Sequence, residues 1–395
     1  MRSLFRVTSV IALIAVSALG SSCDSGPVEI GAVLPTSGSF ALYGEPIRKG
    51  VALAYEEIQA EGGTVLTLDI RDSGGDADRA AELLDELYQA GAVAAIGGVT
   101  TDEALKMVPV VDRRDKVLLS PSASSPLLTG ISRNFFRVYP SDFLEGNKMG
   151  IFAAKDLEID QMVILAAVSP YARGIQDVFK TEYEKNGGRV VEVIEYPAGG
   201  TDFSGLVDRA LQLNPVGIYV ADYAQNTSQI ISALRARRFD GKILTTSAYA
   251  APEVIAEAGS DAEGVILTQI AMPADDPALT AFVAAYEAKY GERPNIWAAH
   301  GYDSLKVLAT AINNGGKLPD DVWGGLRGLR NYHGASGVIQ FDEKGDVGKF
   351  PRTFIIEDGE LVDYEKAVAE KRQEILRRIN ELNRQRSRLQ SSGDG

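Results

Sequence analysis

The chain has few residues of several kinds, and each scarcity excludes a class of protein. Its 395 residues include one cysteine and two histidines, so no intrachain disulfide can staple the fold. The zinc motif HExxH, the redox motif CxxC, the hydrolase motif GxSxG and the nucleotide-binding motif GxxxxGK[ST] are all absent. We therefore expect no enzyme, with no catalytic residue, no metal site and no cofactor.

Positive charge and long apolar runs are also scarce. The 40 Lys and Arg residues are outnumbered by 54 Asp and Glu residues, which gives a formal net charge of -14. An acidic surface repels phosphate backbones, so no nucleic-acid partner is expected. Beyond the N-terminus no run of 18 or more apolar residues occurs, and nothing in the body is expected to span a membrane.

The N-terminus has the features of an export signal. Arg2 and Arg6 precede an uncharged run of 13 residues at 7–19, and Cys23 follows a group of small residues. The run is shorter than the roughly 20 residues of a membrane span, so residues 1–22 are predicted to be a cleaved lipoprotein signal peptide. Its removal takes away two arginines and makes the formal charge -16.

Cys23 at the cleavage point resembles a bacterial lipobox, in which this cysteine receives the lipid. The usual leucine three residues before the cysteine is displaced by one position to Leu19, and Gly20 stands in its place. The resemblance implies lipidation at Cys23 and a protein anchored to the cell membrane, facing the periplasm or the cell exterior. An ordinary secretory signal with a chance cysteine is the alternative.

The body alternates short apolar strands with amphipathic helices. We expect strands at 28–34, 64–70, 92–96 and 117–120 and helices at 45–60, 76–90 and 101–114. The alternation restarts at Ser141, with strands at 162–166, 190–194, 216–220, 242–246 and 264–270 and helices at 143–155, 174–186, 203–213 and 225–238. Helices at 277–290 and 296–313 and a strand-like segment at 337–341 follow. This pattern predicts an α/β protein with two lobes built on parallel sheets.

The last segment has a different character. Between 367 and 389 the apolar residues Val368, Ile375, Leu382 and Leu389 recur every seven positions in a charged stretch. The companion positions Lys371, Arg378 and Gln385 are polar, so the pattern favours a solvated or loosely docked helix over a coiled coil. Residues 391–395 are predicted to form a disordered end.

Polar turns follow three strands of the first predicted sheet. Residues 35–46 follow the first strand, 97–103 the third and 120–126 the fourth. Ligands bind at the carboxyl ends of parallel strands, and free N–H groups at a helix start favour an anion. Thr100 with Glu103 fits a structural capping box, which leaves Thr101 to point into a cleft.

Several of these segments resemble one family in the same order along the chain. They are TSGSFALYGEPIRKG at 36–50, the IGG and SPSAS motifs within 96–124, Tyr171, Tyr223 and FDEKGD at 341–346. Together they resemble the extracytoplasmic solute-binding proteins of branched-chain amino-acid (Leu/Ile/Val-type) ABC transporters, over roughly residues 27–365. That resemblance implies the periplasmic binding protein type I fold.

In that fold, two Rossmann-like lobes form a Venus flytrap joined by a three-crossing hinge, here near residues 141, 269 and 347. The resemblance implies a first lobe of 27–141 with 270–346 and a second of 142–269 with 347–365. Residues 366–395 lie outside it as a charged helix and its disordered end.

The resemblance also implies a ligand site. Thr101 and Ser124 are expected to hold a ligand carboxylate through hydroxyl and backbone N–H groups, and the backbone carbonyl of Ser122 is expected to receive a ligand amine. Tyrosines from both lobes are expected to close over the ligand, although each alone could equally be a packing residue: Tyr43, Tyr171 and Tyr223.

The sequence departs from the family at one position. Ser247 stands where branched-chain receptors carry an acid that pairs with the ligand ammonium. An unpaired buried ammonium is costly. Either Asp222 or Asp102 supplies the charge, or the ligand is an amide, a urea-like molecule or a small carboxylic acid rather than an α-amino acid.

These expectations define a solute-binding protein. Its partners would be a small organic ligand, with an amino acid favoured, an ABC permease, and the membrane through the lipid anchor. A ligand-sensing flytrap subunit of a signalling receptor is the alternative, because a transport receptor does not need the C-terminal helix. An enzyme is disfavoured, since His300 is expected to pack within a helix and His333 to lie in a turn.

Overall fold

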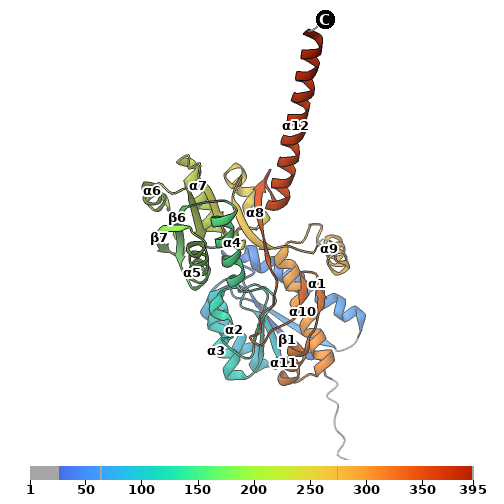
Figure 1. Ribbon diagram of the computed structural model, residues 1–395. Coiled ribbons are helices and arrows are strands. Elements are labelled where there is room, and N and C mark those ends of the chain that lie inside the picture. The colour runs from blue at the N-terminus through green and yellow to red at the C-terminus, as the bar shows by residue number, and fades with distance from the viewer. Residues whose placement is uncertain (1–25, 63–64, 274, 394–395) are drawn as a thin grey trace, which may run out of the picture.

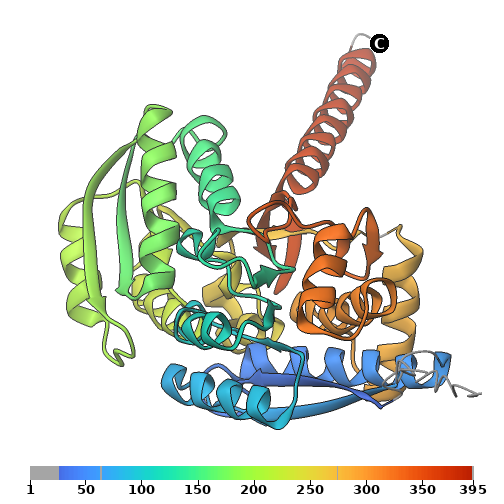
Figure 2. The same cartoon turned by 90° about the horizontal axis from the view of Figure 1, so that it is seen from below.

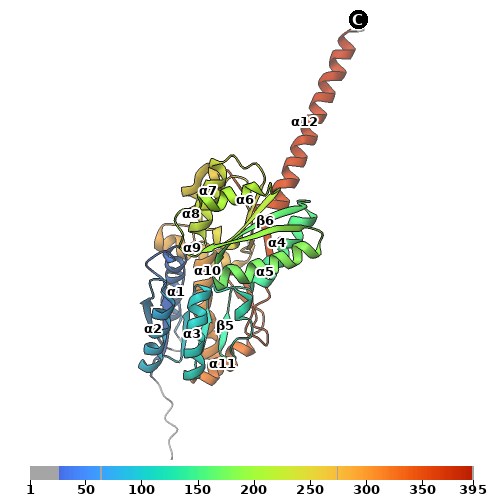
Figure 3. The same cartoon turned by 90° about the vertical axis from the view of Figure 1, so that its left-hand side faces the viewer.

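The computed structural model describes residues 26–62, 65–273 and 275–393. The predicted signal peptide and Cys23 lie outside the described residues. Within them, no helix is both long and apolar enough to cross a membrane. Two lobes stack one above the other, and a single long helix projects from the upper lobe (Figures 1 and 3).

The first lobe is built on a five-stranded parallel sheet in the order β2-β1-β3-β4-β5. The central strands β3 and β4 are short, apolar and buried on both faces, as parallel strands covered by helices usually are, whereas the edge strand β2 is partly exposed. The elements are β1 (Val28–Leu34), α1 (Ala41–Glu61), β2 (Leu66–Asp72), α2 (Ala77–Ala90), β3 (Ala94–Gly97), α3 (Thr101–Arg114), β4 (Val117–Ser120) and β5 (Phe135–Arg137).

The second lobe has a seven-stranded sheet in the order β14-β13-β10-β9-β8-β6-β7. Strands β6 to β10 are parallel, and β13 and β14 add an antiparallel edge. The elements are α4 (Asp142–Lys155), β6 (Gln161–Val168), α5 (Pro170–Lys185), β7 (Arg189–Pro197), α6 (Ser204–Gln212), β8 (Gly217–Ala221), α7 (Ala224–Ala236), β9 (Lys242–Thr245), α8 (Pro252–Ala258), β10 (Ile266–Ile270), β13 (Pro351–Glu357) and β14 (Glu360–Asp363).

The segment between β10 and β13 returns to the first lobe. It contains α9 (Pro277–Tyr290), α10 (Ile296–Gly315), α11 (Pro319–Gly328), β11 (Tyr332–Gly334) and β12 (Gly337–Ile339). Seen from below, the orange α10 lies beside the blue α1, although the two helices are far apart in the sequence (Figure 2). The two-lobe α/β fold is therefore the predicted one. The proposed lobe boundaries stay a prediction.

Several predicted elements differ from the structure. Helix α1 begins at Ala41, whereas the predicted helix began at residue 45. The prediction missed this start because Phe40, which precedes the helix, provides no side-chain cap. Strand β5, helices α8 and α11 and the β13–β14 hairpin were not expected. β5 has three residues, too few for a period, and α8 and α11 are short helices that begin at Pro252 and Pro319.

Helix α12 (Tyr364–Gly393) extends through residues that were expected to be disordered. It leaves the second lobe after β14 and stands away from the body in all three views (Figures 1 to 3). Its apolar side chains at Val368, Ile375, Ile379 and Leu382 are about half exposed. A solvated helix was the favoured prediction, and the described part of α12 has that character.

One buried ion pair fixes the loop after β4. Arg137 on β5 is fully buried, and its guanidinium donates to both carboxylate oxygens of Asp346 at 2.7 and 3.0 Å. It also donates to the backbone carbonyl of Ser125 at 3.0 Å and to Thr129 Oγ1 at 2.7 Å. A bidentate pair with every donor engaged holds the chain that follows β4 in one conformation.

We predict that Asp346→Asn lowers the free energy of unfolding by about 3–5 kcal/mol, because it leaves the Arg137 charge buried without a partner. Asp320→Asn is the matched control. Asp320 pairs with Arg133 at 3.3 Å with both side chains exposed, and its loss should cost at most about 1 kcal/mol. Urea denaturation of both variants checks this, and equal small losses would contradict it.

Candidate functional site

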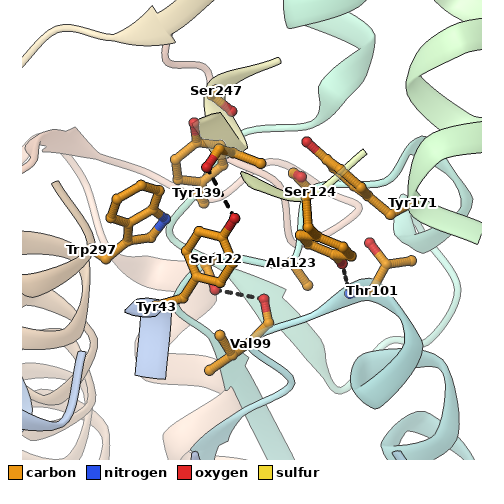
Figure 4. Close-up of a pocket in the computed structure, with 12 residues that line it drawn as sticks. Tyr43, Val99, Thr101, Ser122, Ala123, Ser124, Tyr139, Tyr171, Ser247 and Trp297 are labelled. Atoms are coloured by element: carbon orange, nitrogen blue, oxygen red, sulfur yellow. Dashed lines mark hydrogen bonds between the residues drawn. The ribbon is translucent and has the colours of Figure 1, made fainter. Parts of the chain in front are cut away.

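The carboxyl ends of the two parallel sheets face each other across a small cavity (Figure 4). The cavity volume is about 30 Å³, much less than the roughly 300–1,000 Å³ of ligand sites, so its own side chains fill most of the space. The lining residues come from both lobes: Tyr43, Val99, Thr101, Ser122, Ala123, Ser124, Tyr139, Tyr171, Tyr223, Ser247, Ala248 and Trp297.

Thr101 brings an unused hydrogen-bonding group to this cavity. It is the first residue of α3, behind a capping box in which Thr100 Oγ1 accepts from Glu103 N and the Glu103 carboxylate accepts from Thr100 N. The predicted capping box is thus confirmed. Thr101 is 1% exposed, and its Oγ1 has no hydrogen-bond partner within the described residues. A buried orphan hydroxyl at a helix N-terminus suits a polar or anionic ligand atom.

The two serines after β4 already donate their hydroxyl protons in hydrogen bonds within the protein. Ser122 Oγ donates to the backbone carbonyl of Val99 at 2.7 Å, and Ser124 Oγ donates to Asp142 Oδ2 at 2.9 Å. Both oxygens therefore retain only acceptor capacity. The backbone carbonyl of Ser122 accepts no hydrogen bond from the part of the chain that the structure describes. This loop offers acceptors to the cavity.

The three predicted tyrosines all lie at the cavity. The hydroxyl of Tyr43 on α1 donates to the backbone carbonyl of Ala248 at 3.0 Å and accepts from Ala224 N at 3.1 Å, so it joins the lobes. Tyr171 and Tyr223 stack with ring centroids 4.5 Å apart. Burial raises the pKa of the Tyr43 hydroxyl above its usual range, so this group stays protonated and can donate.

Tyr223 also connects the lobes, because its hydroxyl accepts a long hydrogen bond of 3.4 Å from Thr101 N.

The sequence prediction omitted five lining residues. Trp297 on α10 packs edge-on against Tyr43 with centroids 5.0 Å apart, and it could not be found because α10 reaches the site only through the return of the chain. The other four are Val99, Ala123, Tyr139 and Ala248.

Ser247, which stands in place of the expected acid, contacts an acid that the prediction missed. The backbone N–H of Ser247 donates to Glu145 Oε1 at 2.6 Å. Glu145 and Asp142 lie in the first turn of α4, which Ser141 caps. Acids in a first turn usually serve the helix dipole and stay solvated, so the sequence did not mark them as site residues.

These two acids are buried and have no cationic partner. Asp142 is 1% exposed and Glu145 is 4% exposed, and no ion pair reaches either of them among the residues described. Asp142 Oδ1 has no hydrogen-bond partner in the part of the chain that the structure describes. Burial raises the pKa of both carboxyl groups, and the charge of Asp142 raises that of Glu145 further.

Asp222 and Asp102 lie outside the inner cavity. They line a separate outer hollow of about 350 Å³ on the other side of Tyr43 and Tyr223. Asp222 already accepts from Tyr196 Oη at 2.9 Å, from Asn226 Nδ2 at 2.8 Å and from Tyr223 N at 2.7 Å. The assignment of either acid to the ligand stays a prediction.

The buried histidine is bound within its own helix. His300 Nδ1 lies 2.8 Å from the backbone carbonyl of Ile296, and Lys349 Nζ lies 3.4 Å from its Nε2. Burial and the Lys349 charge lower the pKa of His300, so it stays neutral and packs, as predicted. No group of three acids, cysteines or histidines with the spacing of a metal site occurs in the described ranges.

Comparisons with known proteins agree on one family. A family model described as periplasmic binding protein matches residues 27–353. The leucine-, isoleucine-, valine-, threonine- and alanine-binding protein of Pseudomonas aeruginosa is 25% identical over 356 residues, which cover 88% of this chain and 95% of that protein.

Two solved structures share the fold. A leucine-binding protein from Thermotoga maritima is 28% identical with a TM-score of 0.81, and the match covers 85% of this chain and 97% of that one. A branched-chain amino-acid transporter substrate-binding protein from Streptococcus pneumoniae, in complex with isoleucine, is 25% identical with a TM-score of 0.79, covering 86% and 100%.

We predict that Thr101→Val weakens ligand binding by about 1–3 kcal/mol, because it removes a hydroxyl that only a ligand can satisfy. The melting temperature of the free protein should hold or rise, since a buried orphan hydroxyl is lost. Thr353→Val on β13 is the control, as its Oγ1 is also buried without a partner within the described ranges but lies outside the cavity. Unchanged affinity in Thr101→Val, measured by calorimetry, would contradict the assignment.

Proposed function

This chain belongs to the periplasmic binding protein family, and on that premise we propose that it is a lipid-anchored extracytoplasmic receptor. It captures a small organic ligand, for which an amino acid is the favoured class, and delivers it to an ABC permease. The observation that carries this proposal is the buried polar cavity between two lobes that hydrogen-bond to each other across it.

The cavity supports capture by lobe closure. Tyr43 and Tyr223 make hydrogen bonds between the lobes, and the remaining volume is too small for an amino acid. A ligand must therefore displace the tyrosine side chains or enter while the lobes are apart. Closure is favoured by the ligand only as far as the closed state binds it better than the open state.

The chemistry of the lining supports binding rather than catalysis. A nucleophilic serine needs a general base within hydrogen-bond reach. Ser122 Oγ is bonded instead to a backbone carbonyl, and the lining contains no histidine. Ser124 is bonded to a carboxyl group, but the relatives reported above are all named as binding proteins.

Amino acids are favoured by the names of those relatives and by the polar groups of the cavity. One relative is named for leucine, isoleucine, valine, threonine and alanine, and another was solved with isoleucine. Tyr43, Tyr171, Tyr223 and Trp297 add apolar area for an aliphatic or aromatic side chain.

A sensing subunit is the second candidate, and α12 is the observation that favours it. A projecting helix with half-exposed Val368 and Ile375 is not needed for capture, but it could contact a signalling partner. Neighbouring genes distinguish the two roles: permease and ATPase genes support uptake, and a kinase or cyclase gene supports sensing.

We expect a thermal-shift screen of amino acids, short amides, urea-like compounds and small carboxylic acids to identify a ligand. A binder should add stability as RT ln(1 + [L]/Kd), which is about 2.7 kcal/mol at 100 Kd, so the melting temperature should rise with the logarithm of its concentration. The ligand should be recovered chemically unchanged after incubation. A screen without any binder, or turnover of the compound that binds, would contradict the proposal.

Lipid anchoring is tested separately. Cys23→Ala should move the protein from the membrane fraction to the soluble exported fraction, because each buried acyl methylene contributes about 0.8 kcal/mol to anchoring. Ser22→Ala is the control, since it changes a neighbouring residue and keeps the thiol. Equal partitioning of Cys23→Ala and the unmodified sequence would contradict lipidation at Cys23.

A further inference from the structure

The inner cavity has two unlike ends. Thr101 supplies the orphan hydroxyl and the N-terminus of α3, which together suit an anion. Ser124 and Ser247 each hydrogen-bond to one member of the buried acid pair Asp142 and Glu145. In Figure 4, Ser247 stands at the top of the group of side chains and Thr101 at its lower right.

The direction of one hydrogen bond determines what Ser124 can bind. Because its single hydroxyl proton goes to Asp142 Oδ2, Ser124 Oγ presents only lone pairs to the cavity. The backbone carbonyl of Ser122 is a second acceptor beside it. A carboxylate has no proton to donate to these atoms, whereas an ammonium group has three donors and no acceptor.

Neither acid lines the cavity itself, and the pair is connected to it through Ser124 and Ser247. Within the described chain, five ionisable side chains interact electrostatically with the pair: Arg137 on β5, Tyr139 in the crossing, Tyr171 on α5, Tyr219 on β8 and Tyr223 after β8. Only Arg137 is cationic, and its guanidinium is held in the bidentate pair with Asp346. Asp142 Oδ1 remains without any partner in the described chain.

We propose that Asp142 and Glu145, acting through Ser124 and Ser247, form the cation-recognition element of this cavity, and that the ligand is a zwitterion with a free ammonium group. The acids take the place of the carboxylate that Ser247 lacks. This inference rests on the proposed capture of a small ligand. It changes the role expected for Ser124, which becomes an acceptor for the amine and not a donor to the carboxylate.

Binding is then linked to proton release. Burial raises the pKa of both carboxyl groups toward neutrality, and a bound cation favours their ionised form. As the pH falls the pair takes up protons and its attraction for an ammonium group is lost. Affinity for the zwitterion therefore rises between about pH 5 and pH 8, where the ligand amine itself stays charged.

The experiment compares standard L-amino acids with their deaminated acids, for example L-leucine with 4-methylpentanoate. We expect the unmodified protein to prefer the amino acid, and calorimetry in buffers of different ionisation enthalpy to show proton release on binding. Asp142→Asn and Glu145→Gln, which keep the side-chain shape, should each weaken amino-acid binding by about 10- to 100-fold. Affinity for the deaminated acid should hold or increase.

Asp303→Asn is the matched control. Asp303 is a buried carboxyl group that accepts from Ala335 N at 2.8 Å and Ser336 N at 2.7 Å, away from the cavity. Its replacement should lower stability without changing the ratio of the two affinities. If a cavity variant does not fold, the pH profile and proton release of the unmodified protein still test the proposal.

Three results would overturn the inference. One is equal affinity of the unmodified protein for the amino acid and its deaminated acid. Another is a ratio of these two affinities that stays unchanged in both Asp142→Asn and Glu145→Gln. The third is loss of the preference in Asp222→Asn alone, which would assign the amine to the outer hollow. If only plain carboxylates or amides bind in the screen, zwitterion recognition is contradicted and the proposed solute capture is supported. If no compound binds, both proposals are contradicted.

Discussion

The constraint on which the rest of this structure depends is the desolvation of polar groups where the two sheets meet. Parallel strands bring their carboxyl ends to one edge, and the two edges are buried against each other. Every polar atom there must find a partner or remain unsatisfied at a cost of about 1–3 kcal/mol. Tyr43 meets this requirement by bonding to Ala248 and Ala224 of the other lobe. Thr101 Oγ1 and Asp142 Oδ1 have no partner among the residues described, and Thr101, which lines the cavity, is where we propose that a ligand is bound.

Much of the fold could be predicted because it depends on local patterns. Strands such as 117–120 are uninterrupted apolar runs, and the capping box of Thr100 and Glu103 is visible three residues apart. What could not be predicted lacks such a local signal. Strand β5 is defined by its pairing with β4, and the β13–β14 hairpin joins the second sheet only because the chain crosses between lobes a third time. The start of α1 was missed because no capping side chain precedes it.

The site shows the same division between local and long-range information. Thr101, Ser122, Ser124, Tyr171 and Tyr223 lie just after strands, so their place at the sheet edge follows from topology. Tyr43 lies in the first turn of α1 instead, and all six residues line the cavity. Trp297 comes from a helix in the returning segment. Asp142 and Glu145 follow the first crossing rather than a strand, so strand-end reasoning passes over them. Asp222 does follow a strand, yet its carboxylate is engaged by Tyr196, Asn226 and its own helix start.

A receptor that lacks the usual acid can recover the same charge from a different element. The backbone N–H of Ser247 donates to Glu145 on α4. Ser124 on the first lobe reaches Asp142 on the same helix turn, so one turn of α4 contacts both walls of the cavity. In the proposed receptor, closure and ionisation would be coupled, because moving the lobes apart would expose the acid pair to water and relieve the desolvation that raises its pKa. The first turn of α4 thus connects the charge of the ligand to the position of the lobes.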